Sequence, residues 1–172
     1  MIKKTDGGVT AAKGFEAIGI AAGIKKGKKD MALIYSRIPC EVAGTFTTNV
    51  VKAAPVKWDQ EVVYHSESAQ AVIINSGIAN ACTGAEGYGY CKQTAEAAAK
   101  ALNVPESSVL VASTGVIGMQ LPMDRIAAGV ELLAKGKEDT EEAGLDAAKA
   151  IMLTYSSGSF GNKRRTIFFS GR

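Results

Sequence analysis

Residues 109–121 read VLVASTGVIGMQL and are the stretch around which the predicted fold is organised. The apolar run at 109–112 is suited to a buried strand. We expect Ser113, Thr114 and Gly115 to end this strand in a loop, because hydroxyl side chains and glycine favour turns. Backbone N–H groups exposed in such a loop can bind a phosphate or a developing oxyanion. The alternative is a tight turn, in which Gly115 adopts an unusual backbone angle and Thr114 bonds locally.

Further strand candidates lie upstream of this stretch. MALIYS at 31–36 and QAVIIN at 70–75 are short apolar runs, and the second is suited to the centre of a sheet. Residues 14–24 are rich in glycine, which disfavours a helix, so we expect an extended arm or a strand there. The segment AGTFTTN at 43–49 is predicted as another strand because threonine fits a pleated surface. Residues 52–56 are predicted as the loop that follows it.

Three helices are predicted in the second half of the chain. The first is the alanine-rich segment 86–102, which ends before Pro105. The second spans 124–134 and begins at the capping residue Asp124. The third follows capping residues at 139–142 and runs to about residue 152.

The order of these elements limits the fold class. Strand candidates precede the first helix, whereas a purely parallel sheet needs a crossover helix between its strands. We therefore predict the α/β class, with a layered mixed β-sheet and helices on one face.

Composition excludes several classes of protein. A chain of 172 residues with 47% hydrophobic and 22% charged residues is typical of one globular domain. A net charge of +3 and only 6% aromatic residues argue against a nucleic-acid partner. The sequence contains no apolar stretch long enough to cross a membrane and does not begin like a signal peptide.

The cysteines and the single histidine restrict the chemistry. Cys40, Cys82 and Cys91 are odd in number and lack paired spacing, which suits the reducing cytoplasm and not a disulfide framework. His65 lies in a polar stretch and is predicted as a surface loop residue. One histidine provides neither a zinc-type cluster nor a Ser-His-Asp triad, so no metal site is expected.

Small polar residues gather behind three strand candidates, at 45–49, 75–84 and 113–118. If these strands are neighbours, the clusters meet at one edge of the sheet, where α/β proteins bind ligands. The glycine motifs of dinucleotide and Walker-type sites are missing. The residues alone therefore predict a small-molecule site for a phosphate or an oxyanion.

Several ordered motifs resemble the N-terminal half of the ornithine acetyltransferase family, the bifunctional glutamate N-acetyltransferases of arginine biosynthesis. The resemblance covers roughly residues 7–152. The motifs are GGVT at 7–10, KGF at 13–15, AGTFTTNVVKAAPV at 43–56, NSGIANACTG at 75–84, VLVASTGVIG at 109–118 and LPM at 121–123.

This resemblance implies the α-chain half of an αββα-type, self-processing N-terminal-threonine hydrolase-like fold. In the family, self-cleavage exposes a threonine at the start of a β chain, and its own α-amine serves as the base. The acetyl group passes from N-acetylornithine to this threonine and then to glutamate without a cofactor; some members also accept acetyl-CoA as donor. The family forms αβ heterodimers or α2β2 heterotetramers.

By the resemblance, Thr114 and Gly115 belong to the oxyanion hole, and Thr154 retains a substrate-binding hydroxyl. After 150–152 the similarity is lost, and the Ala-Thr cleavage point is missing. We therefore expect an α-chain-like domain at 1–152 and a tail at 153–172 without family resemblance. The nucleophile is expected to be absent from a truncated or frame-shifted α portion, which should be inactive alone.

Two other functions fit the same residues. One is a related self-processing amidohydrolase, which would use water as the acceptor in place of glutamate. The other is a non-catalytic remnant that binds a small anion with the loops at 75–84 and 113–118.

Overall fold

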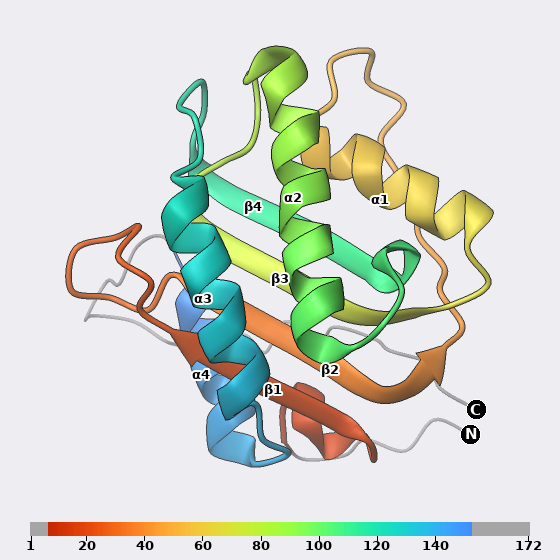
Figure 1. Ribbon diagram of the computed structural model, residues 1–172, viewed down its shortest axis with the longest axis vertical. Helices are drawn as coiled ribbons and strands as arrows, with labels where there is room; N and C mark the ends of the chain where they lie inside the picture. The colour runs from red at the N-terminus through yellow and green to blue at the C-terminus, as the bar shows by residue number, and fades with distance from the viewer. Residues whose placement is uncertain (1–6, 153–172) are drawn as a thin grey trace.

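The computed structural model describes residues 7–152, which form a four-stranded mixed sheet covered by helices (Figure 1). The strand order is β1-β2-β3-β4; the first two pairs are antiparallel, and β3 and β4 are parallel. The strands are β1 (Phe15–Ile20), β2 (Met31–Cys40), β3 (Ala69–Ile78) and β4 (Val109–Val116). The predicted α/β class with a mixed sheet is confirmed.

The helices lie on both faces of this sheet. They are α1 (Ala54–His65), α2 (Gly84–Leu102), α3 (Met123–Gly136) and α4 (Glu141–Ile151). In Figure 1, α1, α2 and α3 lie in front of the sheet and α4 lies behind it. The expectation of helices on one face alone was therefore wrong for α4, which packs mainly on β1 and β2. No helix within residues 7–152 is long and apolar enough to cross a lipid bilayer.

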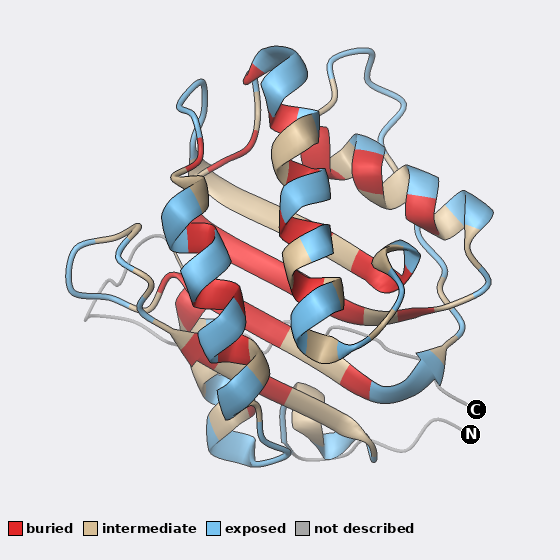
Figure 2. Cartoon of the chain, viewed as in Figure 1, coloured by how far each residue is buried: buried red, intermediate tan, exposed pale blue. Residues whose placement is uncertain are grey.

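The alternation of side chains along the strands produces two cores. Ile73 and Val111 point toward α1, α2 and α3, where Trp58 and Ile126 join the larger core. The next residue of β3, Ile74, points toward α4 and joins a smaller core built mainly of alanine. Figure 2 shows the buried residues of the sheet beneath the three front helices.

Small residues let the helices approach the sheet closely. Ala95 and Ala98 of α2 are fully buried. On the other face, a Cβ atom on Gly19 would lie 2.0 Å from the carbonyl oxygen of Asp146, so β1 and α4 touch through their backbones. The Thr140 hydroxyl accepts a hydrogen bond from the Ala143 N–H at 3.2 Å and so caps α4, as its sequence predicted.

Two predictions in the first half of the chain were wrong. Residues 43–49 are not a strand but part of the connection between β2 and α1. The predicted loop at 52–56 contains the start of α1, which has Pro55 in its first turn, where a missing N–H costs nothing. His65 is consequently the last residue of a helix, although it is exposed as expected.

Candidate functional site

The predicted site residues lie on two paired strands. Ser113, Thr114 and Gly115 continue β4 to Val116, so the expected loop at this point was wrong. The parallel partner β3 likewise extends to Ile78. The pairs are Asn75 with Ser113, Ser76 with Thr114 and Gly77 with Gly115.

The pair formed by Gly77 and Gly115 is the point of closest approach. Their φ angles are +106° and +137°, a region that side-chain-bearing residues rarely adopt. A Cβ atom on Gly115 would lie 2.3 Å from the carbonyl carbon and oxygen of Gly77. Glycine is therefore required here, because two peptide units pass each other without room for a side chain.

Strand β4 is the edge of the sheet, and α1 covers only its first half. The Trp58 indole N–H donates to the Val109 carbonyl at 2.9 Å, and an Asp59 carboxylate oxygen accepts from the Val111 N–H at 2.9 Å. The backbone groups of alternate residues in a strand face the same way. The N–H of Gly115 therefore points away from β3, as that of Val111 does, but beyond the contacts made by Trp58 and Asp59.

The free hydrogen-bond donor of Thr114 is its side chain and not its backbone. By the same alternation the Thr114 N–H faces β3, whereas the Thr114 hydroxyl forms no hydrogen bond within residues 7–152. Both residues are half-buried, so neither is enclosed in the interior. Together they present one backbone N–H and one side-chain hydroxyl, which are both donors that a negatively charged oxygen can accept.

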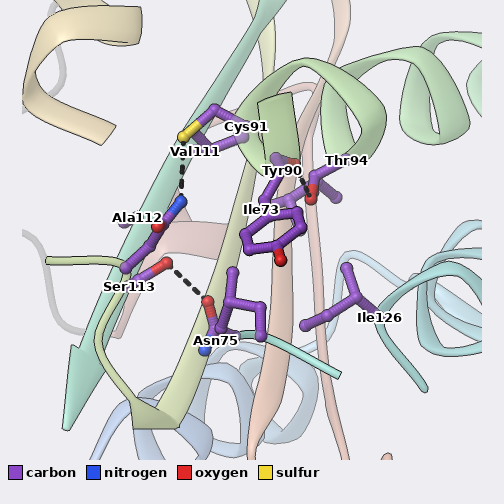
Figure 3. Close-up of a pocket in the computed structure, with 11 residues that line it drawn as sticks. Ile73, Asn75, Tyr90, Cys91, Thr94, Val111, Ala112, Ser113 and Ile126 are labelled. Atoms are coloured by element: carbon purple, nitrogen blue, oxygen red, sulfur yellow. Dashed lines mark hydrogen bonds between the residues drawn. The ribbon is translucent and has the colours of Figure 1, made fainter. Parts of the chain in front are cut away.

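Asn75 and Ser113 brace this part of the sheet. The Ser113 hydroxyl donates to the Asn75 side-chain oxygen at 2.6 Å (Figure 3). The Asn75 amide donates to the Ile78 carbonyl at 2.8 Å. A partly buried link across the two strands thus lies one residue before Thr114. Because it joins both strands at this position, it limits movement of Thr114 and Gly115.

Other polar side chains of the segment 75–84 also form hydrogen bonds within the protein. Asn80 is almost fully buried; it donates to the Gly87 carbonyl at 2.7 Å and accepts from the Thr83 hydroxyl at 2.7 Å. These bonds hold the loop against the start of α2. The high content of small polar residues is therefore accounted for, within the described residues, by the protein's own hydrogen bonds.

The cavity beside Asn75 is too small for an amino-acid ligand. It lies between α2 and the paired strands, and Asn75, Tyr90, Thr94 and Ser113 contribute to its wall (Figure 3). Its volume is about 10 Å³, which is the space of about one water molecule. This cavity therefore does not serve as the binding site of a larger ligand.

A larger cleft of about 460 Å³ lies at the other end of β4, beside the end of α1. Trp58, Glu61, His65 and Glu106 are among its lining residues. Because Glu106 lies in the short turn Glu106–Ser108 that precedes Val109, this cleft is separated from Gly115 by the length of the strand.

Two titratable groups with raised pKa values, the half-buried Asp59 and the buried Cys91, lie on the helices that cover the first half of β4. Burial raises the pKa of Asp59 to about 7, although the bond from the Val111 N–H opposes this rise. Burial and the nearby Asp59 carboxylate raise the pKa of the Cys91 thiol to about 12. Cys91 is also only 2% exposed, so it is unsuited to act as a nucleophile. Trp58 and Asp59 were not among the predicted site residues, because no element was predicted for residues 57–64.

The third predicted site residue, Thr154, lies outside the described residues. The structure therefore brings Thr114 and Gly115 together with Ser76 and Gly77, and it leaves the expected substrate contact at Thr154 a prediction.

Comparison with known proteins is consistent with this geometry. The model of the ArgJ family matches residues 16–158. The arginine biosynthesis bifunctional protein ArgJ of Thermotoga neapolitana is 45% identical over 156 residues, covering 90% of this chain and 38% of that protein. Its counterpart in Symbiobacterium thermophilum is 51% identical over 151 residues, covering 86% of this chain and 37% of that protein. The chain thus spans less than two fifths of the length of these relatives.

Two solved structures share the fold. ArgJ from Bacillus halodurans superposes with a TM-score of 0.83 at 43% identity, over 87% of this chain and 78% of that one. Ornithine acetyltransferase from Mycobacterium tuberculosis, solved in complex with ornithine, gives a TM-score of 0.83 at 47% identity, over 87% and 80% of the chains. The resemblance seen in the sequence motifs is confirmed, and the chain belongs to the ArgJ family.

Proposed function

We propose that this chain is the α-side portion of a bifunctional ornithine acetyltransferase and N-acetylglutamate synthase. The enzyme moves an acetyl group from N-acetylornithine to glutamate in arginine biosynthesis. Family membership supports this proposal, as does the ornithine bound to the ornithine acetyltransferase of Mycobacterium tuberculosis. The observation that carries it is the position of Thr114 and Gly115 in the second half of the edge strand β4, where strand alternation turns the Gly115 N–H away from β3.

In the proposed reaction, a threonine hydroxyl of the β chain attacks the acetyl carbonyl and gives its proton to the threonine's own α-amine. The negative charge that forms on the carbonyl oxygen is stabilised by the Gly115 N–H and the Thr114 hydroxyl. Collapse of this intermediate breaks the amide bond, and ornithine leaves with the proton. The glutamate amine then attacks the threonine ester, which forms N-acetylglutamate and restores the hydroxyl.

The chain's own share of this chemistry is the oxyanion hole, and the nucleophile comes from the β chain. We propose that residues 1–152 form the α-chain domain, that Thr154 contacts substrate, and that the assembly is an αβ heterodimer or α2β2 heterotetramer. The reaction needs no cofactor, and acetyl-CoA is an alternative donor. Three free cysteines among the described residues suit a reducing compartment such as the cytoplasm.

Reconstitution tests this proposal. The purified chain is assayed alone and together with the C-terminal portion of Thermotoga neapolitana ArgJ, with N-acetylornithine as donor and glutamate as acceptor. We expect no turnover from the chain alone and transfer from the mixture. Thr114→Val should lower kcat by about a hundred-fold, since one oxyanion donor contributes about 3 kcal/mol, whereas Thr114→Ser should retain most activity.

The other outcomes identify the competing functions. Release of acetate without N-acetylglutamate would indicate an amidohydrolase. Absence of turnover combined with calorimetric binding of phosphate or N-acetylglutamate would indicate an anion-binding remnant. Turnover by the chain alone would contradict the requirement for a second portion.

A further inference from the structure

The end of α4 is tied to the strand that pairs with the oxyanion residues. The Ser76 hydroxyl donates to the Ala150 carbonyl, and Ser76 is fully buried. The Lys25 ammonium donates to the Met152 carbonyl at 2.8 Å and, more weakly, to that of Ala150 at 3.4 Å. Two side chains from distant parts of the sequence thus bind the last carbonyl groups of one helix.

Lys25 is held in place for this contact. It belongs to the loop between β1 and β2, which folds around the fully buried Asp30. The Asp30 carboxylate accepts from the Ala22 N–H at 2.6 Å and from the Lys25 N–H at 2.7 Å. The Asp30 carbonyl in turn accepts from the Ser76 N–H at 2.8 Å. The loop that carries Lys25 is therefore bonded directly to β3 at Ser76.

The positive charge of Lys25 is favourable at the C-terminal end of α4. Within residues 7–152 its ammonium forms no ion pair with a carboxylate, and its hydrogen bonds go to the C-terminal end of α4. The carbonyl end of a helix carries a partial negative charge, so a cation is favoured there. A neutral side chain of the same length would lose both the hydrogen bonds and this electrostatic attraction.

The same two residues lie against the proposed oxyanion hole. Ser76 is the register partner of Thr114, and Gly77 is that of Gly115. The stem of Lys25 passes over Gly77, where a Cβ atom would lie 2.9 Å from Lys25 Cγ. Displacement of Lys25 therefore affects the end of α4 and the peptide that packs on Gly115.

We propose that Lys25 and Ser76 are positioning residues, which hold the C-terminal end of α4 in register with the strand that carries Thr114 and Gly115. The contacts that carry this role end on the carbonyls of Ala150 and Met152, at the last turn of α4. The inference rests on the proposed function for its catalytic meaning, but the contact itself is tested without substrate.

The test uses nuclear magnetic resonance of the whole 172-residue chain carrying Lys25→Met, Lys25→Arg, Ser76→Ala or, as a control, Lys26→Met. Lys26 is exposed, lies in the same loop and has the same charge. In Lys25→Met we expect amide exchange at 149–152 to rise about ten-fold, because the helix end loses its cation and two hydrogen bonds. We also expect the Gly115 N–H resonance to shift.

Ser76→Ala should reproduce both changes, Lys25→Arg should restore most of the wild-type behaviour, and Lys26→Met should have neither effect. Unchanged exchange at 149–152, or an unmoved Gly115 resonance in Lys25→Met, would overturn the proposal. Equal acceleration along the whole of α4 would also overturn it, since that indicates general destabilisation. Because neither measurement needs a ligand, failure of the reconstituted mixture to transfer acetyl groups would contradict the proposed function and leave this result standing.

Discussion

The two halves of β4 differ in what covers their outer edge. From Val109 to Val111 the edge is covered, because Trp58 and Asp59 of α1 form hydrogen bonds with the backbone groups that a further strand would pair with. From Ser113 to Val116 those two side chains give no cover, and the strand carries hydroxyl groups and a glycine. One strand is thus part of the core at one end and more exposed at the other, where the proposed oxyanion residues lie.

The contrast shows how an edge strand is protected without losing a site. An uncovered edge invites pairing with other chains, so most proteins blunt or cover it. Here a helix covers the half whose side chains are apolar, and it leaves uncovered the half that contains the proposed oxyanion donors. The difference depends on a few contacts, and each of the following changes alters one of them.

The largest effect is expected from filling the space between the facing glycines. Gly115→Ala should reduce the free energy of unfolding by about 4 kcal/mol, because strained backbone adds to overpacking against Gly77. Urea denaturation measures this loss. Gly118→Ala is the matched control: its φ is also positive, at +80°, but no atom lies within 4 Å of the added Cβ. Equal losses in both variants would show that the close approach to Gly77 is unimportant.

A smaller, pH-dependent effect on the free energy of unfolding is expected at Asp59, which covers the first half of β4. Asp59 has a pKa of about 7 in the folded chain, against about 3.9 when unfolded. Between these values only the unfolded state loses the proton, so this group lowers stability as the pH rises from about 4 to 7. Asp59→Asn keeps an oxygen for the Val111 N–H and removes the charge.

The variant Asp59→Asn should therefore be more stable than wild type by about 3 kcal/mol at pH 8 and nearly equal to it at pH 4. Urea denaturation at the two pH values gives the comparison. Glu61→Gln, an exposed change in the same helix, should show no such difference. A gain in Asp59→Asn that is the same at both pH values would rule out titration of Asp59 as its cause.

The smallest effect is expected at the boundary between the two halves. Ser113→Ala removes the hydrogen bond to Asn75 and should lower the free energy of unfolding by about 1 kcal/mol. In the reconstituted enzyme the same change should lower kcat more than it raises KM, since it loosens the strands beside Thr114. Ser107→Ala, on the exposed turn before β4, provides the control. A Ser113 variant with unchanged stability and kcat would show that this link does not brace the site.

Local signals in the sequence predicted the second half of the chain better than the first. The alanines of α2 and the capping Thr140 of α4 act within one or two turns, so their effect can be recognised without knowing the fold. Helix α1 lacks such signals: Val56, Val62 and Val63 disfavour a helix, and Pro55 resembles a breaker. What stabilises α1 is packing of Trp58 on β4, a contact between residues 51 positions apart.

The conformation of the candidate site could not be predicted for the same reason. The oxyanion role of Thr114 and Gly115 stays a prediction, and the loop expected for them was wrong. Pairing with Ser76 and Gly77 keeps them in the strand, and no local pattern encodes that register. Similarly, the three threonines of 43–49 favour a strand, yet the sheet contains no neighbour for them. In both segments, 113–115 and 43–49, the conformation depends on pairing with residues distant in the sequence.

The facing glycines also restrict how the sequence of this sheet can vary. A Cβ atom would lie 2.9 Å from Lys25 Cγ at Gly77 and 2.3 Å from the Gly77 carbonyl group at Gly115. A larger residue at either position therefore requires its neighbours to move, and substitutions that keep the pairing of β3 and β4 are confined to the residues around these two glycines.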